Sequence, residues 1–297
     1  MVRRAVTARV IAWVGLIGCI ALGAAGGAAV ERPPLTAGGY TVLAADFHVH
    51  SFPGDGGLLP WDLAGEARRR DLDAIALTNH NSLFSWRVAQ RFGSSFDGTI
   101  VLPGIELTSS GYHIAAIGVR EVVPWRQSPV QAAAAIHAQG GLAIAAHPLG
   151  PVPSAWDAAA LAAVDGFEAA SSRDTVAQTA PFIRQAVARR PALAPFGGSD
   201  FHYYTPLGVN RTFLFVTGRS RDGMFEAIRS GRTVACDSRG EVFGPPALLA
   251  PVAAECRRVA TARPSGWHWV DGVSTGGAWI SLVALIVLGP RDRSVAL

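Results

Sequence analysis

Between residues 42 and 240 the sequence alternates short apolar runs with amphipathic stretches, and this alternation strongly limits the possible folds. The apolar runs are bounded by Gly, Pro, Asp or Asn, which is typical of buried strands. We predict strands at residues 42–49, 74–78, 99–107, 114–119, 142–146, 164–169, 192–197 and 212–216, and helices at 62–70, 130–139, 175–189 and 221–230. Strands that alternate with helices form a parallel sheet covered by helices. So many units in a domain of about 200 residues favour a closed α/β barrel over an open sheet.

The distribution of charge excludes several classes of function. The chain carries a net charge of +4, but residues 46–241 hold 17 Arg against 18 Asp plus Glu, a balance of −1. The positive excess therefore lies near the two ends of the chain, and a nucleic-acid partner is disfavoured. All 26 basic residues are Arg. The absence of Lys excludes Schiff-base chemistry and phosphate binding by a P-loop, because both need a Lys side chain.

The first apolar segment follows Arg3, Arg4 and Arg9 and runs from residue 10 to residue 30. This pattern is typical of an export signal or a signal anchor, and its length suits a membrane span. We therefore expect residues 1–30 to anchor the chain, with the catalytic domain outside the cytoplasm. The alternative is a cleaved signal peptide and a secreted protein. Residues 16–19 also resemble a lipoprotein processing box, although the residues after Cys19 stay apolar.

A second apolar segment covers residues 272–290. Trp267, Trp269 and Trp279 lie at one side of it, and Arg291 and Arg293 lie at the other. Tryptophans at one edge and arginines at the opposite edge are typical of a transmembrane segment. The alternative is a buried terminal strand or helix. Residues 31–41 then form a linker and residues 241–271 a tether rich in Pro and Ala. Cys236 and Cys256 lie in the exported part, where a disulfide is permitted but not required.

His, Asp and Glu residues recur where the predicted strands end. Five strand ends each carry at least one such residue, and these are His48 and His50, His80, Glu106 with His113 just beyond, His147, and Asp200 with His202; Asp55 follows the first strand in a Gly-rich loop. In a barrel of this topology, the C-terminal strand ends form the active-site face. So many ligand-type side chains on one face repel one another or are poorly solvated without cations. The pattern therefore predicts a site for divalent metals bound by nitrogen and oxygen.

The ordered series of these residues resembles the PHP family, the polymerase and histidinol phosphatase metallohydrolases. The resemblance covers roughly residues 46–240 and implies a distorted (β/α)7 TIM-like barrel that binds two or three ions of Mn, Zn, Fe or Mg. It assigns the first ion to His48, His50, Glu106 and Asp200. It makes Glu106 a bridge to a second ion held by His113 and His147, and it assigns a third ion to Asp55, His80 and His202. The chain departs from the family at Asn79 and Asn81, where the family usually has Asp, and this departure weakens the expectation of a third ion.

Paired divalent metals can hold a bridging hydroxide and clamp the oxygens of a displacement at phosphorus. We therefore expect hydrolysis of a small phosphate monoester or diester, with Asp200, His202 and Arg173 as catalytic candidates. Arg173 follows the strand at 164–169 and could stabilise charge on a transferred phosphoryl group. The alternatives are a carbamate, amide or ester hydrolase, or a metal-binding module at the membrane without enzymatic activity. His137 and His268 are expected to have structural or interfacial roles.

Overall fold

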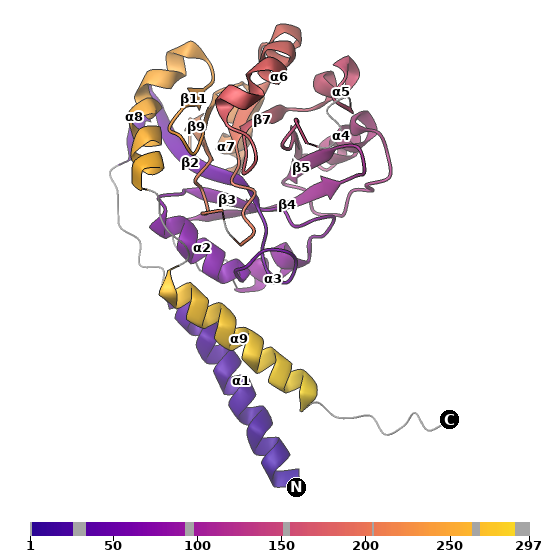
Figure 1. The fold of residues 1–297 in the computed structure, drawn as a ribbon, viewed down its shortest axis with the longest axis vertical. Helices are drawn as coiled ribbons and strands as arrows, with labels where there is room; N and C mark the ends of the chain where they lie inside the picture. The colour runs from indigo at the N-terminus through magenta and orange to yellow at the C-terminus, as the bar shows by residue number, and fades with distance from the viewer. Residues whose placement is uncertain are drawn as a thin grey trace.

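The computed structural model describes residues 2–25, 34–92, 98–150, 155–203, 205–262 and 268–288 (Figure 1). The helices are α1 (Val2–Ala25), α2 (Pro60–Arg69), α3 (Phe84–Phe92), α4 (Pro129–Ala138), α5 (Ala158–Ala163), α6 (Val176–Arg189), α7 (Arg221–Arg229), α8 (Pro246–Ala262) and α9 (Trp269–Val287). The strands are β1 (Leu35–Ala37), β2 (Tyr40–Val49), β3 (Ala74–Leu77), β4 (Ile100–Thr108), β5 (His113–Ile117), β6 (Leu142–Ala145), β7 (Gly166–Ala170), β8 (Ala194–Gly197), β9 (Arg211–Val216), β10 (Thr233–Cys236) and β11 (Val242–Phe243). Residues 26–33 of the expected leader and linker, together with Trp267, Arg291 and Arg293, lie outside the described residues.

The strands form one sheet in the order β11-β10-β9-β2-β3-β4-β5-β6-β7-β8, and the sheet curves into a nearly closed barrel. The two sides of the barrel meet between β8 and β9. There the Gly197 amide donates to Oγ1 of Thr212 at 3.1 Å, and that hydroxyl donates back to the Gly197 carbonyl at 3.0 Å. Helices cover the outside of the barrel (Figure 1). The expected α/β barrel is therefore confirmed.

Antiparallel strands, β5 among them, distort the barrel. Pairs β2–β3, β3–β4, β6–β7 and β7–β8 are parallel, whereas β5 runs antiparallel to both β4 and β6, and β9 runs antiparallel to β2 and β10. The connection between Thr108 and His113 is too short for a crossover helix, so the chain must turn back as a hairpin. As a result the start of β5 lies beside the end of β4, and Thr108 pairs with His113 in the register. His113 thus reaches the same end of the barrel as the residues that follow parallel strands.

One buried cluster fills the inside of the barrel. It joins side chains from strands all around the sheet with the inner face of α7, and its members include Leu43, Phe47, Ile117, Phe196 and Phe225. The rings of Phe47 and Phe196 meet edge to face, with their centroids 5.6 Å apart. Apolar packing of this kind makes the barrel a filled core, so polar side chains collect only at its rim.

Part of the expected tether, residues 246–262, instead forms helix α8, which packs on the barrel. A disulfide joins Cys256 of α8 to Cys236 of β10, and Val252 of α8 is fully buried. Two prolines and many alanines had suggested an irregular segment. However, Pro246 occupies the first position of the helix, where its missing N–H costs nothing.

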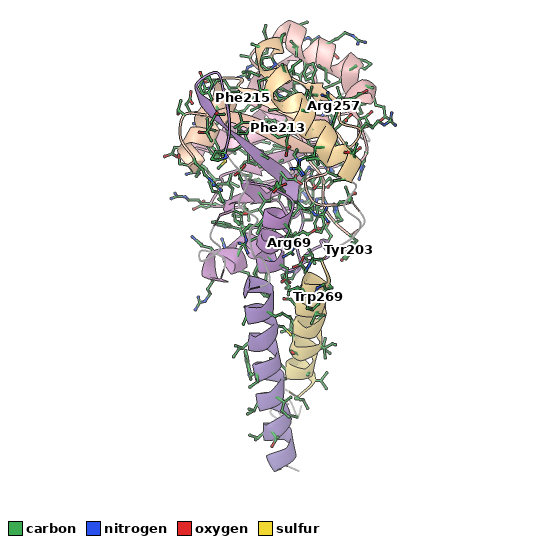
Figure 2. All side chains as sticks on the ribbon, turned by 90° about the vertical axis from the view of Figure 1, so that its left-hand side faces the viewer. Arg69, Tyr203, Phe213, Phe215, Arg257 and Trp269 are labelled. Atoms are coloured by element: carbon green, nitrogen blue, oxygen red, sulfur yellow. A yellow bond between two sulfur atoms is a disulfide. The ribbon has the colours of Figure 1, made fainter. Side chains whose placement is uncertain are left out.

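The two apolar segments form the long helices α1 and α9, which lie side by side and extend away from the barrel (Figures 1 and 2). Each is long and apolar enough to cross a membrane, over Val6–Gly23 and Trp269–Val287. Many of their apolar side chains are exposed, including Ile11, Val14, Ile280 and Ile286. The second segment is therefore a helix with an exposed apolar face, and not a buried core element.

Candidate metal centre

The expected His and carboxylate residues converge at one end of the barrel. His48 lies on β2 and His50 follows it, His80 follows β3, Glu106 lies on β4, His113 starts β5, His147 follows β6, and Asp200 and His202 follow β8. Their donor atoms form three groups, each with its atoms within 4.8 Å of one another. Oδ1 of Asp200 lies 3.3 Å from Nε2 of His48, although 152 positions of sequence separate the two residues.

Glu106 stands at the centre of the cluster, and its two oxygens face different partners. Oε1 lies 2.7 Å from Nδ1 of His113 and 3.0 Å from Nε2 of His147. Oε2 lies 3.4 Å from Nε2 of His48 and 3.3 Å from Nε2 of His50, and the more exposed His80 approaches it with Nδ1 at 2.8 Å. One buried carboxylate thus connects two groups of donors.

The first group comprises His48, His50, Glu106 and Asp200, and all four residues are buried. Among the residues that the structure describes, three buried atoms of this group have no hydrogen-bond partner, namely Nε2 of His48, Nε2 of His50 and Oε2 of Glu106. Buried polar atoms without partners are costly, and here all three face the same point. A cation at that point would satisfy them together.

The third group lies at the accessible side of the cluster. Oδ2 of Asp55 is 3.0 Å from Nε2 of His80 and 3.2 Å from Nε2 of His202. Oδ1 of Asp55 is 3.0 Å from Nδ1 of His50, whose Nε2 belongs to the first group. The side chains of Asp55, His80 and His202 are 39%, 37% and 32% exposed, so this group faces the solvent.

Burial and the neighbouring charged groups shift the pKa values of the cluster in opposite directions. Burial raises the pKa of Glu106, yet the neighbouring imidazoles, led by His48, hold that pKa well below its usual value. Burial lowers the pKa of His50, yet three neighbouring carboxylates, led by Asp200, raise it to about 10. Glu106 is therefore charged, and His50 is protonated. A divalent cation would take the place of the His50 proton, since a His ligand must be neutral.

Comparison with known proteins identifies the fold. No family model matches the sequence. An uncharacterised protein of Methanocaldococcus jannaschii is 28% identical over 122 residues, which are 37% of this chain and 70% of that protein. A two-domain protein of Bacteroides vulgatus, described as containing a predicted PHP-like metal-dependent phosphoesterase, superposes with a TM-score of 0.59 at 24% identity, over 76% of this chain and 73% of that one. PsfC of Pseudomonas syringae superposes with a TM-score of 0.52 at 19% identity, over 74% of this chain and 96% of that one.

The chain has the PHP fold. The resemblance found in the sequence is thereby confirmed at the level of the fold. The PHP barrel also explains why residues so far apart in the sequence meet, because the C-terminal ends of its strands share one rim.

The two asparagines that depart from the usual PHP pattern have structural roles. The Asn79 amide donates to the Ser51 carbonyl at 2.7 Å, and its Oδ1 accepts from the Ser51 amide and hydroxyl. Asn81 donates to the Thr108 carbonyl and accepts from the Thr108 amide. Both side chains act as donor and acceptor at once, which an ionised Asp cannot do. They position the loops that precede Asp55 and follow His80.

Sequence reasoning missed two buried carboxylates. Oε1 of Glu168, on β7, lies 2.8 Å from Nδ1 of His48, and Oε2 accepts from the His147 amide. Asp46 accepts from the amides of Ser199 and Gly208, and burial raises its pKa to about 6. An acidic residue within an otherwise apolar buried strand, as at Glu168, is the signal that could have revealed the first of these.

The remaining candidates lie outside the cluster. Arg173 is exposed on the loop after β7, and it is Ser172 of this loop that donates to Oδ2 of Asp200, at 2.9 Å. His137 pairs with Asp165 at the surface. His268 caps the N-terminus of α9 by accepting from the Val270 amide. The described geometry therefore does not assign Arg173 a contact with the cluster.

Proposed function

We propose that the chain is a metal-dependent phosphoesterase that binds two or three divalent ions (Mn, Zn, Fe or Mg) at the rim of its PHP barrel. The observation that carries the proposal is the placement of Glu106, whose two carboxylate oxygens face two separate groups of imidazoles in a buried site. A carboxylate that bridges two cations needs this arrangement. The orphaned atoms of His48 and His50 support the same conclusion.

The donor set fits divalent metals, because it combines imidazole nitrogens with carboxylate oxygens. His48, His50, Glu106 and Asp200 would hold one ion. Glu106, His113 and His147 would hold a second, and Asp55, His80 and His202 a third. When bound, paired cations lower the pKa of a water molecule and stabilise charge on phosphoryl oxygens.

The protein's own residues orient these donors. Glu168 accepts from His48 and fixes the imidazole so that Nε2 points into the cluster. Ser172 donates to Oδ2 of Asp200, which leaves Oδ1 to face the first group. His202 lies at the accessible rim, close to where a leaving group would depart. Arg173 is exposed on a neighbouring loop and retains its proposed role of pairing with a phosphate oxygen.

We further propose that α1 and α9 hold the barrel at a membrane, outside the cytoplasm. Their length and apolar composition support the anchor. The disulfide between Cys236 and Cys256 supports a location outside the cytoplasm, since disulfides persist in oxidising environments.

A panel of substrates tests the proposal. Purified protein would be stripped with a chelator, reconstituted separately with Mn²⁺, Zn²⁺, Fe²⁺ or Mg²⁺, and offered activated phosphate monoesters, phosphate diesters, carboxyl esters and carbamates. We expect metal-dependent release from a phosphate ester. Preference for carbamates or carboxyl esters would support the esterase or amidase alternative, and metal binding without hydrolysis would indicate a binding module.

A further inference from the structure

The loop that carries Asp55 reaches the apolar helices. The ring of Phe52, which lies between His50 and Asp55 in the sequence, contacts the ring of Trp279 on α9, with the centroids 3.9 Å apart. Phe52 packs on a cluster that includes Leu59 and Ala278, and residues of α1 pack on the same cluster. The edge of the candidate metal centre is therefore built directly against the paired helices.

Buried polar contacts fix this arrangement. Asp271 of α9 is fully buried and pairs with Arg69 of α2. On the next turn of α9, the Thr275 hydroxyl donates to Asp62 of α2 at 2.8 Å. A buried carboxylate is costly unless it is paired, so these contacts specify one orientation of the helices on the barrel. Figure 2 shows Arg69 at the end of the barrel from which α1 and α9 extend.

Both helices leave an apolar surface exposed along much of their described length. On α9 it runs from Trp269 through Val273 and Trp279 to Val287, which at 1.5 Å per residue is about 27 Å. On α1 it extends from Val6 to Ile17, about 17 Å by the same measure. The hydrocarbon core of a bilayer is about 30 Å thick. If the two helices cross a membrane, a bilayer that covers the exposed apolar residues of α9 includes the level of Trp279 and Phe52, beside the metal centre.

The rim of the barrel at this level has the composition of a membrane interface. Phe84 follows the His80 loop and is 57% exposed, and Tyr203 follows His202 and is 50% exposed. Figure 2 shows Tyr203 at the end of the barrel where α9 begins. Helix α3 also exposes Arg87 and Arg91. Aromatic rings favour the headgroup region of a bilayer, and Arg pairs with phosphate.

We propose that the metal centre opens at the bilayer surface and that its substrate is the phosphate ester of a membrane lipid. The inference rests on the proposed phosphoesterase function and names its substrate class. The lipid headgroup would enter at the exposed third group, formed by Asp55, His80 and His202, while the acyl chains remain among the apolar residues of α1 and α9. A soluble substrate would not require the metal-bearing loop to contact a membrane helix.

The position of the rim can be measured without any catalytic readout. The full-length chain with Cys19→Ser would carry either Phe84→Cys or Gln185→Cys, labelled with an environment-sensitive fluorophore. Gln185 is exposed on α6, at the opposite end of the barrel from the two helices (Figure 1). In phosphatidylcholine and phosphatidylglycerol vesicles that contain a spin-labelled quencher lipid, we expect loss of fluorescence at position 84 and none at position 185. Equal fluorescence at both positions would overturn the inference.

The substrate class is tested with the same vesicles. Metal-reconstituted wild type would be offered phosphatidic acid in the bilayer and, separately, the soluble ester p-nitrophenyl phosphate. We expect a higher kcat/KM for the lipid, with a rate that follows its surface density. A preference for the soluble ester would overturn the inference and leave the proposed function intact. No metal-dependent release from either ester would contradict the proposed function, and the inference with it.

Discussion

Glu106 and His113 lie on neighbouring antiparallel strands, and 2.7 Å separates Oε1 of the carboxylate from Nδ1 of the imidazole. His147 approaches the same oxygen, whereas His48 and His50 face Oε2. This division of one carboxylate between two groups of imidazoles is the relationship on which the proposed chemistry depends, and it makes the loss of individual metal sites predictable.

Changing His113 to Ala should remove the second ion and keep the first. His113 belongs to the group of Glu106 and His147 but not to the group around His48, so the loss should be confined to one site. Elemental analysis of purified protein should therefore show about one ion fewer than wild type, since one ligand group is broken. His137→Ala, a change at an exposed His paired with Asp165 outside the cluster, is the matched control. Equal metal content in both variants would contradict the assignment.

Changing Glu168 to Gln should weaken the first site without removing a ligand. Glu168 accepts from Nδ1 of His48 and fixes the direction of Nε2. Loss of such a supporting carboxylate typically lowers metal affinity by about 10–100-fold. Competition with a chromogenic chelator would measure this affinity. An unchanged affinity would show that the His48 ring is oriented by other contacts.

Changing Asn79 to Asp should destabilise the fold while adding the charge that the PHP family usually has there. The Ser51 carbonyl would lose its donor, and the new carboxylate would face that carbonyl. A buried acceptor left without its partner costs about 1–3 kcal/mol. We expect a lower melting temperature in scanning fluorimetry. A melting temperature at or above that of wild type would mean that the asparagine is not required by the loop.

Removing the disulfide should free helix α8 from the barrel. With Cys236 and Cys256 both changed to Ser, the closed loop of the unfolded chain opens, and the free energy of unfolding should fall by about 3 kcal/mol. Proteolysis between residues 246 and 262 should then become faster. Cys19→Ser, which changes a free thiol, is the control and should behave like wild type. Equal resistance to proteolysis in both variants would show that packing alone holds α8.

The sequence predicted the barrel and the convergence of its polar residues for a clear reason. Strand ends are marked by apolar runs that stop at a His, Asp or Glu, and parallel strands bring those ends together. The antiparallel direction of β5 was not predicted, because it depends on the length of the turn after Thr108. Helix α8 was also missed, because its two prolines suggested an irregular segment, although its Ala, Leu and Arg residues favour a helix.

Contacts across the fold were beyond what the sequence could reveal. The sequence does not indicate the contact between Glu168 and His48, because 120 positions separate the two residues. The contact between Phe52 and Trp279 depends on how two terminal helices dock onto one loop, which no periodic pattern encodes. Likewise, the sequence cannot show which oxygen of Glu106 faces which imidazole, because this depends on differences of a few ångströms in the folded site.

The metal content and activity of Glu106→Gln test the central claim most directly. The substitution keeps the volume of the side chain and removes the charge that would offset two cations, so both sites should weaken together. Bound metal should be highest in wild type, intermediate or unchanged in His202→Ala, and lowest in Glu106→Gln. Hydrolysis of an activated phosphodiester should fall in Glu106→Gln by at least about 10²–10³-fold, as when a main electrostatic contributor is lost. Full metal content and full activity in Glu106→Gln would contradict the bridge and the mechanism built on it.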